Sequence, residues 1–158
     1  MSSRPSTDPY TLGLNLLARR ELSEMQLRER FRKRKFAAPA IDAALERLRG
    51  EGAIDNRRMA FAYARTAVRL TTRGRRRVAQ EIVARGIDDK MAREAVDAAF
   101  ADVDETVVLA RALAKRLDGP VRNAAHLRRL HRFLQRQGFP TSLIVHALAE
   151  HAPDDAEE

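Results

Sequence analysis

Apolar residues recur along this chain at intervals of three and four, which places them on one face of an α-helix. Leu27 and Phe31 form one such stripe, and Ile41, Leu45 and Leu48 form the next. No segment shows a convincing strand pattern, so the predicted fold class is all-α. The pattern predicts nine short helices at about residues 9–20, 24–35, 39–50, 56–70, 75–85, 89–100, 106–117, 123–137 and 141–151.

Polar residues and glycines mark where several of these helices begin or end. Asp8 precedes Pro9. Proline is tolerated at the first helical position because a backbone N–H at that position would have no partner within the helix, so nothing is lost when proline lacks it. Residues 23–26 read as a capping box, in which Ser23 and Gln26 satisfy each other's backbone N–H groups. Gly86 is placed to end the fifth helix.

The nine predicted helices fall into three groups of three with matching apolar positions. The anchors of the alignment are Phe36, Ile87 and Phe139, which lie 51 and 52 residues apart. All three anchors are expected in the core. The positions nine and five residues before each anchor are also expected to be buried: Leu27, Val78 and Leu130, then Phe31, Ile82 and Leu134.

This alignment predicts three three-helix repeats at residues 10–54, 55–102 and 103–152. Each unit barely covers its own core, so consecutive units should pack in series as an elongated, curved array. We expect residues 1–9 to form a disordered leader and residues 153–158 a solvated acidic tail.

Composition excludes several classes of protein. Aromatic residues make up 5% of the 158 residues and there are 7 glycines, which disfavours a sheet fold. The absence of cysteine excludes a disulfide scaffold and thiolate metal sites. The apolar runs are far shorter than the ~20 residues of a membrane helix, and the first residues lack the apolar core of a signal peptide. We therefore expect a cytoplasmic protein that does not bind membranes and is a monomer when free.

The chain carries 30 Lys+Arg against 22 Asp+Glu, a net charge of +8, and nearly all its basic residues are arginines. Arginine binds phosphate bidentately, which favours a nucleic-acid backbone as partner. An acid-free stretch supplies the first-choice binding residues: Arg58, Arg65, Arg69, Arg73, Arg75, Arg76 and Arg77. Two weaker stripes supply secondary candidates: Arg28, Arg32 and Lys35, and Arg129, Arg132 and Arg136.

No constellation of residues indicates catalysis. The histidines are spaced five apart in each pair, unlike the four of a helical zinc site, and no glycine-rich phosphate loop occurs. The acidic residues 102–105 suit a helix cap better than a metal-dependent nuclease site. We predict no catalytic residue, no cofactor and no metal.

Several motifs resemble the RecX family of recombination regulators. These are residues 16–23 followed by Leu27 and Phe31, then Gly52 to Asn56 with Arg58 to Ala60 and Tyr63 to Arg65, then Gly74 to Arg77, and finally Arg129 to Leu134 with Gly138 and Phe139. The resemblance covers about residues 10–150. The chain departs from the usual family pattern at Met59, where an aromatic residue is common, and at Arg75, where proline is common.

The resemblance implies three tandem three-helix repeats in an arc. It also implies a regulator that docks along the groove of a RecA–DNA filament and lowers its ATP turnover and strand exchange. A helix-turn-helix transcription regulator is the alternative, because three-helix units are also the core of such proteins. Its recognition helices would need polar side chains, whereas residues 41–48 and 91–100 are mostly alanine and apolar.

Overall fold

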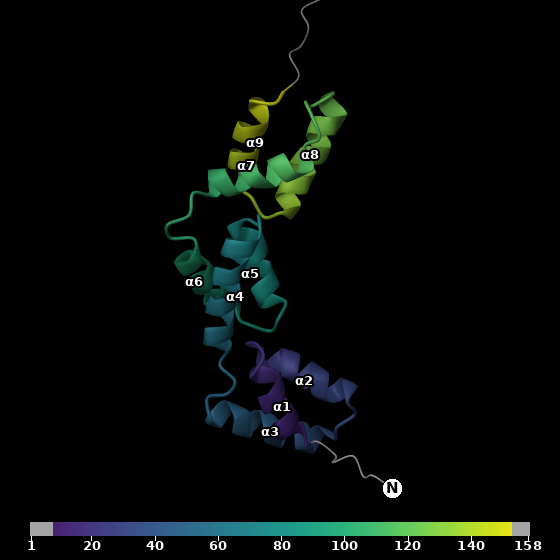
Figure 1. Ribbon diagram of the computed structural model, residues 1–158, viewed down its shortest axis with the longest axis vertical. Helices are drawn as coiled ribbons and strands as arrows, with labels where there is room; N and C mark the ends of the chain where they lie inside the picture. Colours follow the sequence, from purple (N-terminus) through teal and green to yellow (C-terminus); the bar gives the residue numbers. More distant parts are fainter. Residues whose placement is uncertain (1–7, 153–158) are drawn as a thin grey trace, which may run out of the picture.

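The computed structural model describes residues 8–152, and within that range it contains nine α-helices and no strand (Figure 1). The predicted all-α fold class is therefore confirmed. The helices are α1 (Pro9–Leu17), α2 (Glu24–Lys33), α3 (Ala38–Gly50), α4 (Asn56–Leu70), α5 (Arg75–Val83), α6 (Asp89–Ala99), α7 (Glu105–Arg116), α8 (Ala124–Arg136) and α9 (Thr141–Ala149).

The predicted caps set the helix starts. The carboxylate of Asp8 accepts a hydrogen bond from the N–H of Thr11 at 2.9 Å, and Pro9 is the first residue of α1. The predicted leader of residues 1–9 is thus wrong for its last two residues, and residues 1–7, like the predicted tail 153–158, lie outside the described part. Helix α1 ends at Leu17, earlier than predicted, because the chain turns there to bury Leu22.

The helices pack in threes around three separate cores. Helices α1, α2 and α3 form one group, α4, α5 and α6 the second, and α7, α8 and α9 the third. Each group encloses its own cluster of buried apolar side chains. The groups stack end to end in an elongated array (Figure 1). In that view the middle group lies to the left of the outer two, so the array is bowed as predicted.

Eight of the nine side chains predicted in the core are buried. Phe36 is the exception, because its ring is half-buried and meets Phe31 edge-on with 6.2 Å between centroids. The equivalent Phe139 is covered in part by the preceding repeat, since its ring lies against Gly74. Phe36 packs against the core of its own repeat, and no other repeat among residues 8–152 covers it in this way.

Consecutive repeats meet at equivalent positions in the two junctions. The residue that caps the second helix of one repeat donates a hydrogen bond to a carbonyl just before the glycine turn of the next repeat. At the first junction the hydroxyl of Ser23 donates to the carbonyl of Arg85. At the second, the N–H of Gly74 donates to the carbonyl of Gln137 at 2.8 Å.

The glycines at these turns are required by both conformation and space. Gly86 and Gly138 have φ of +85° and +93°, in the left-handed region that favours glycine. A Cβ on Gly86 would lie 2.6 Å from the Cβ of Met25, and one on Gly138 would lie 2.6 Å from the Cβ of Arg77. Lys35 takes the same left-handed conformation, with φ of +62°, in the first repeat.

Gly138→Ala should therefore cost more stability than Gly52→Ala. Gly52 also has a positive φ, of +72°, but a Cβ there would meet nothing within 4 Å. Alanine at Gly138 has the same conformational penalty and also collides with the backbone of Arg77, which adds about 1–3 kcal/mol. Chemical denaturation of both variants measures the difference, and equal losses would show that the second junction is not closely packed.

Phe31→Ala should lower the free energy of unfolding by about 3–5 kcal/mol, because the side chain is fully buried and truncation leaves a cavity. Phe36→Ala in the same core is the control and should cost clearly less, since that ring is only half-buried. Urea titration of the two variants checks the order. A smaller loss for Phe31→Ala than for Phe36→Ala would contradict it.

Candidate nucleic-acid interface

The arginines selected from the sequence divide into two groups in the structure. Four of the seven first-choice residues form ion pairs with acids that lie outside the acid-free stretch: Arg58, Arg73, Arg75 and Arg77. Arg28 among the secondary candidates is also paired, at 2.6 Å from Asp42. The acid-free stretch of sequence is therefore partly neutralised in space, and these arginines have structural contacts that the sequence analysis did not predict.

Arg58 ties the start of α4 to the first repeat. Its Nε donates to Glu21 at 2.6 Å, and its terminal nitrogens donate to the carbonyls of Gly52 and Ala53 at 3.3 and 3.2 Å. The hydrogen bond that Arg58 donates to the Glu21 carboxylate raises the pKa of the guanidinium above its already high value. These contacts hold the guanidinium against the linker between α3 and α4.

Arg75 performs a similar role at the second junction. Its guanidinium donates to the carbonyl of Phe100 at 3.1 Å and pairs with Asp97 at 3.3 Å. Its backbone N–H donates to Glu105, at the start of α7, at 3.1 Å. Proline at this position would have no N–H and could not make this last bond.

Glu81 on α5 gathers two of the first-choice arginines. Its carboxylate accepts from Tyr63 at 2.5 Å, from Arg73 at 2.9 Å and from Arg77 at 3.0 Å. Burial opposes ionisation of Glu81, but the hydrogen bonds from Tyr63 and Arg77 and the nearby charges outweigh it, so the pKa of the carboxyl lies below its usual value. The ionised Glu81 carboxylate thus holds three side chains of the middle repeat together.

The remaining candidates have no ion-pair partner among residues 8–152, and their side chains are exposed. They are Arg65 and Arg69 on α4, Arg76 on α5, Arg129, Arg132 and Arg136 on α8, and Arg32 and Lys35 near the end of α2. In addition, no basic side chain of residues 103–152 forms an ion pair within the described part of the chain. The third repeat therefore presents the least neutralised basic surface.

The structure brings two of these groups together across the second junction. A hollow of about 700 Å³ lies between α5 and α8, and its lining contains no acidic residue. Four arginines line it: Arg76, Arg77, Arg132 and Arg136. A guanidinium nitrogen of Arg77 also donates to the carbonyl of Arg136 at 3.4 Å, which joins the two walls. We call this feature the basic hollow.

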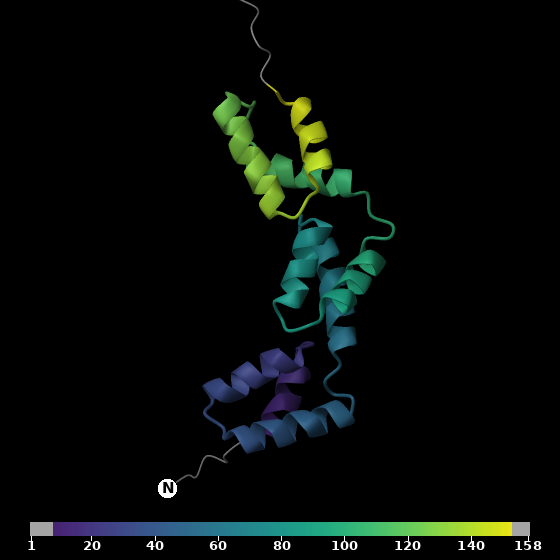
Figure 2. The same cartoon turned by 180° about the vertical axis from the view of Figure 1, so that it is seen from behind.

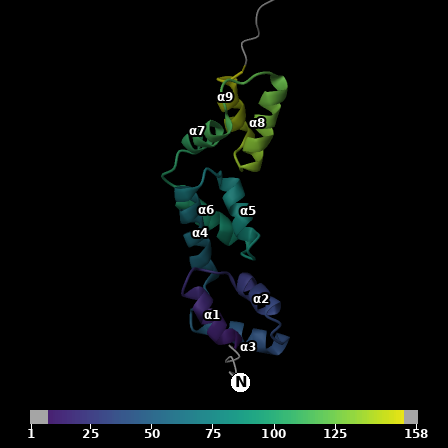
Figure 3. The same cartoon turned by 45° about the vertical axis from the view of Figure 1, so that its right-hand side comes forward.

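The basic hollow lies on the edge of the array formed by the second helices. Figure 3 shows α2, α5 and α8 following one another along the right-hand side, and Figure 2 shows the same order from behind. Gln80 and Gln135 also line the hollow, and the sequence analysis missed both. The sequence gives no sign that they share a site, because Gln80 lies in the second repeat and Gln135 in the third, and only the packing at the junction brings them to the same hollow.

Two other chemistries find no support in the described residues. Within residues 8–152, no group of three or more His, Asp or Glu side chains is arranged to hold a metal ion. In the same range, no helix is long and apolar enough to span a membrane.

Comparison with known proteins places this arrangement in a family. Family models of the first and second three-helix domains of RecX match residues 10–48 and 55–96. A protein named "Regulatory protein RecX" from Chromohalobacter salexigens is 34% identical over 150 residues, which cover 94% of this chain and 95% of the relative. The chain belongs to the RecX family.

Other similar proteins extend this result. "Regulatory protein RecX" from Geobacillus thermodenitrificans is 32% identical over 153 residues, and the match covers 94% of this chain but only 56% of that longer relative. The crystal structure of RecX from Lactobacillus salivarius has the same fold, with a TM-score of 0.68 over 90% of this chain and 93% of that one at 22% identity. Membership in a family of regulatory proteins confirms the prediction of a non-enzymatic protein.

Glu81→Gln should destabilise the protein near neutral pH by about 1–3 kcal/mol, because it weakens the half-buried ion pairs that Glu81 forms with Arg73 and Arg77. Folding lowers the pKa of Glu81, so its contribution is complete above the ordinary value of 4.5 and is lost as the pH falls through the folded-state pKa. The gap between wild type and variant should therefore narrow below about pH 4.

Thermal or urea unfolding between pH 3 and pH 7 measures this gap. Glu94→Gln is the matched control, since Glu94 forms an exposed pair with Arg57 at 2.7 Å and should contribute at most about 1 kcal/mol. A constant gap across the pH range would show that Glu81 acts through packing and not through its charge.

Proposed function

We propose that this protein is a non-enzymatic regulator of homologous recombination and DNA repair that binds RecA–DNA filaments and inhibits their ATPase and strand-exchange activities. It acts as a monomer in the cytoplasm, with its three repeats at residues 10–54, 55–102 and 103–152. The protein contacts the DNA backbone through its arginines and the recombinase through other surfaces.

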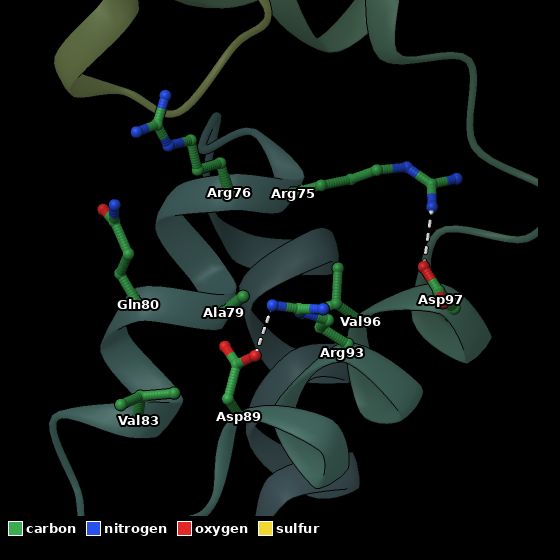
Figure 4. A pocket seen from close by; sticks show the side chains of 9 residues that line it. All are labelled: Arg75, Arg76, Ala79, Gln80, Val83, Asp89, Arg93, Val96 and Asp97. Carbon is green, nitrogen blue, oxygen red and sulfur yellow. Dashed lines mark hydrogen bonds and ion pairs between the residues drawn. The ribbon is translucent and has the colours of Figure 1, made fainter.

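The basic hollow is the observation that carries the nucleic-acid part of this proposal. Arginine guanidiniums recognise phosphate oxygens bidentately, and four of them line one concave surface. Three of the four have no carboxylate partner within residues 8–152, so a phosphate would not have to displace one: Arg76, Arg132 and Arg136. Figure 4 shows Arg76 directed away from α6 and toward the third repeat.

The chemistry of the hollow favours contact with the backbone over reading of bases. Its polar groups are arginines and glutamines at a junction between two repeats, and no recognition helix projects from it. Phosphate contacts position a protein on nucleic acid without specifying sequence. A filament regulator needs this property, because it must act wherever the filament has formed.

The shape of the molecule also supports a filament as partner. The second helices stack along one edge of an elongated array, and this edge carries exposed basic residues from α2 to α8. A long basic edge can follow an extended polyanion over several phosphates, whereas a compact domain of the same charge would contact fewer.

Two matched double variants test the site. Arg132→Ala with Arg136→Ala removes one wall of the basic hollow, and Arg65→Ala with Arg69→Ala removes two equally exposed arginines from α4. The first pair should lower the slope of log K against log[salt] for single-stranded DNA by about 1.4, at about 0.7 per phosphate contact. The second pair should change the slope less, because α4 does not line the hollow.

Fluorescence anisotropy with two unrelated oligonucleotides measures both slopes, and circular dichroism checks the fold. The same proteins are then added at substoichiometric ratios to a DNA-dependent RecA ATPase assay. Wild type should lower the ATPase rate and the hollow variant should lower it less. Selection of a consensus sequence from a random duplex pool, or an unchanged ATPase rate with wild type, would overturn the proposal.

A further inference from the structure

The seam between the second and third helices differs among the three repeats, although it is built from equivalent positions. In the first repeat it is crossed by an ion pair between Arg28 on α2 and Asp42 on α3, at 2.6 Å. The positions equivalent to these two are Ala79 and Arg93 in the middle repeat, and His131 and Val145 in the third.

In the middle repeat the seam is a hollow of about 550 Å³ that is lined in part by ion-paired side chains (Figure 4). Its apolar lining residues are Ala79, Val83 and Val96. Arg93 pairs with Asp89 along α6, and Arg75 of α5 pairs with Asp97 of α6. Any partner there would have to compete with ion pairs that are already formed.

In the third repeat the corresponding hollow is apolar, and no ion pair among the described residues lines it. It measures about 320 Å³ between α8 and α9, and five of its seven lining residues are aliphatic: Leu127, Val145, Leu148, Ala149 and Ala152. Leu148 is its buried floor, while the side chain of Val145 is 56% exposed at its edge. An exposed apolar concavity of this size can receive one apolar side chain of a partner.

Charge indicates the chemistry of that partner. The two polar residues of the hollow are Arg128 and His131, both on α8, and no acidic residue lines it. Neither forms an ion pair within the described part of the chain. A partner that inserts an aliphatic side chain and presents carboxylates beside it would satisfy both the floor and the rim.

We propose that the hollow between α8 and α9 is a docking site for an aliphatic side chain flanked by acidic residues on the surface of a protein partner. This inference rests on the proposed function, in which that partner is the recombinase of the filament. Residues of α8 then serve two ligands, because Arg132 and Arg136 line the basic hollow while Leu127, Arg128 and His131 line the apolar one. The third repeat thus holds protein and nucleic acid at once.

The test places a charge at the edge of the hollow. Val145→Glu should weaken binding to RecA–DNA filaments at least about tenfold, because it introduces a carboxylate opposite the acidic partner. Val145→Lys should weaken it less, since its ammonium faces carboxylates. Val107→Glu is the control, because Val107 on α7 is an exposed valine, at 46%, that does not line the hollow. It should bind filaments like wild type.

Binding to filaments and to bare single-stranded DNA is measured for all four proteins by biolayer interferometry. Val145→Glu should leave the DNA affinity and its salt slope unchanged. If wild type binds filaments and Val145→Glu binds them equally well, or if Glu and Lys weaken binding equally, the docking site is wrong. If wild type binds DNA but no filament, the proposed function itself fails. If wild type sediments as a dimer that Val145→Glu dissociates, the hollow is a self-association surface and the proposal is overturned.

Discussion

Consecutive repeats of this protein meet where the start of one second helix contacts the backbone at the glycine turn of the next repeat. At the second junction Gly74 donates to the carbonyl of Gln137 at 2.8 Å, and a Cβ on Gly74 would lie 2.7 Å from the carbonyl oxygen of Gly138. So close an approach fixes the distance between α5 and α8. The basic hollow exists because of that distance, since its arginines come from both helices.

The arginines of the chain serve two purposes that their sequence positions do not separate. In the first two repeats, carboxylates outside the acid-free stretch hold many of them in place, as Glu21 holds Arg58 and Glu81 holds Arg73. Such pairs at exposed or half-exposed positions contribute little stability each, but they fix side chains at the linkers between helices. In the third repeat the arginines have no such carboxylate partners among the described residues, so their guanidiniums are not held against the protein in this way.

The periodicity of the sequence was sufficient to predict the nine helices, their grouping and eight of nine core side chains. These features depend on local spacing, which a single chain displays directly. The prediction that Phe36 is buried is wrong because the equivalent Phe139 is covered by a neighbouring repeat, and no repeat among residues 8–152 covers Phe36 in that way. The basic hollow was missed for a related reason: Arg76 and Arg132 were seen as separate stripes, and only the junction brings them together.

A chain built from similar units that stack head to tail has no intrinsic reason to stop at its own ends, so a second molecule could in principle continue the stack. Lys35 affects whether such stacking is possible, because it occupies the left-handed turn where the other two repeats have glycine. At Gly86 and Gly138 even one added carbon would collide with the neighbouring unit. The larger side chain of Lys35 at the same place leaves no room for another unit to pack against this turn in the way that the neighbouring units pack against Gly86 and Gly138.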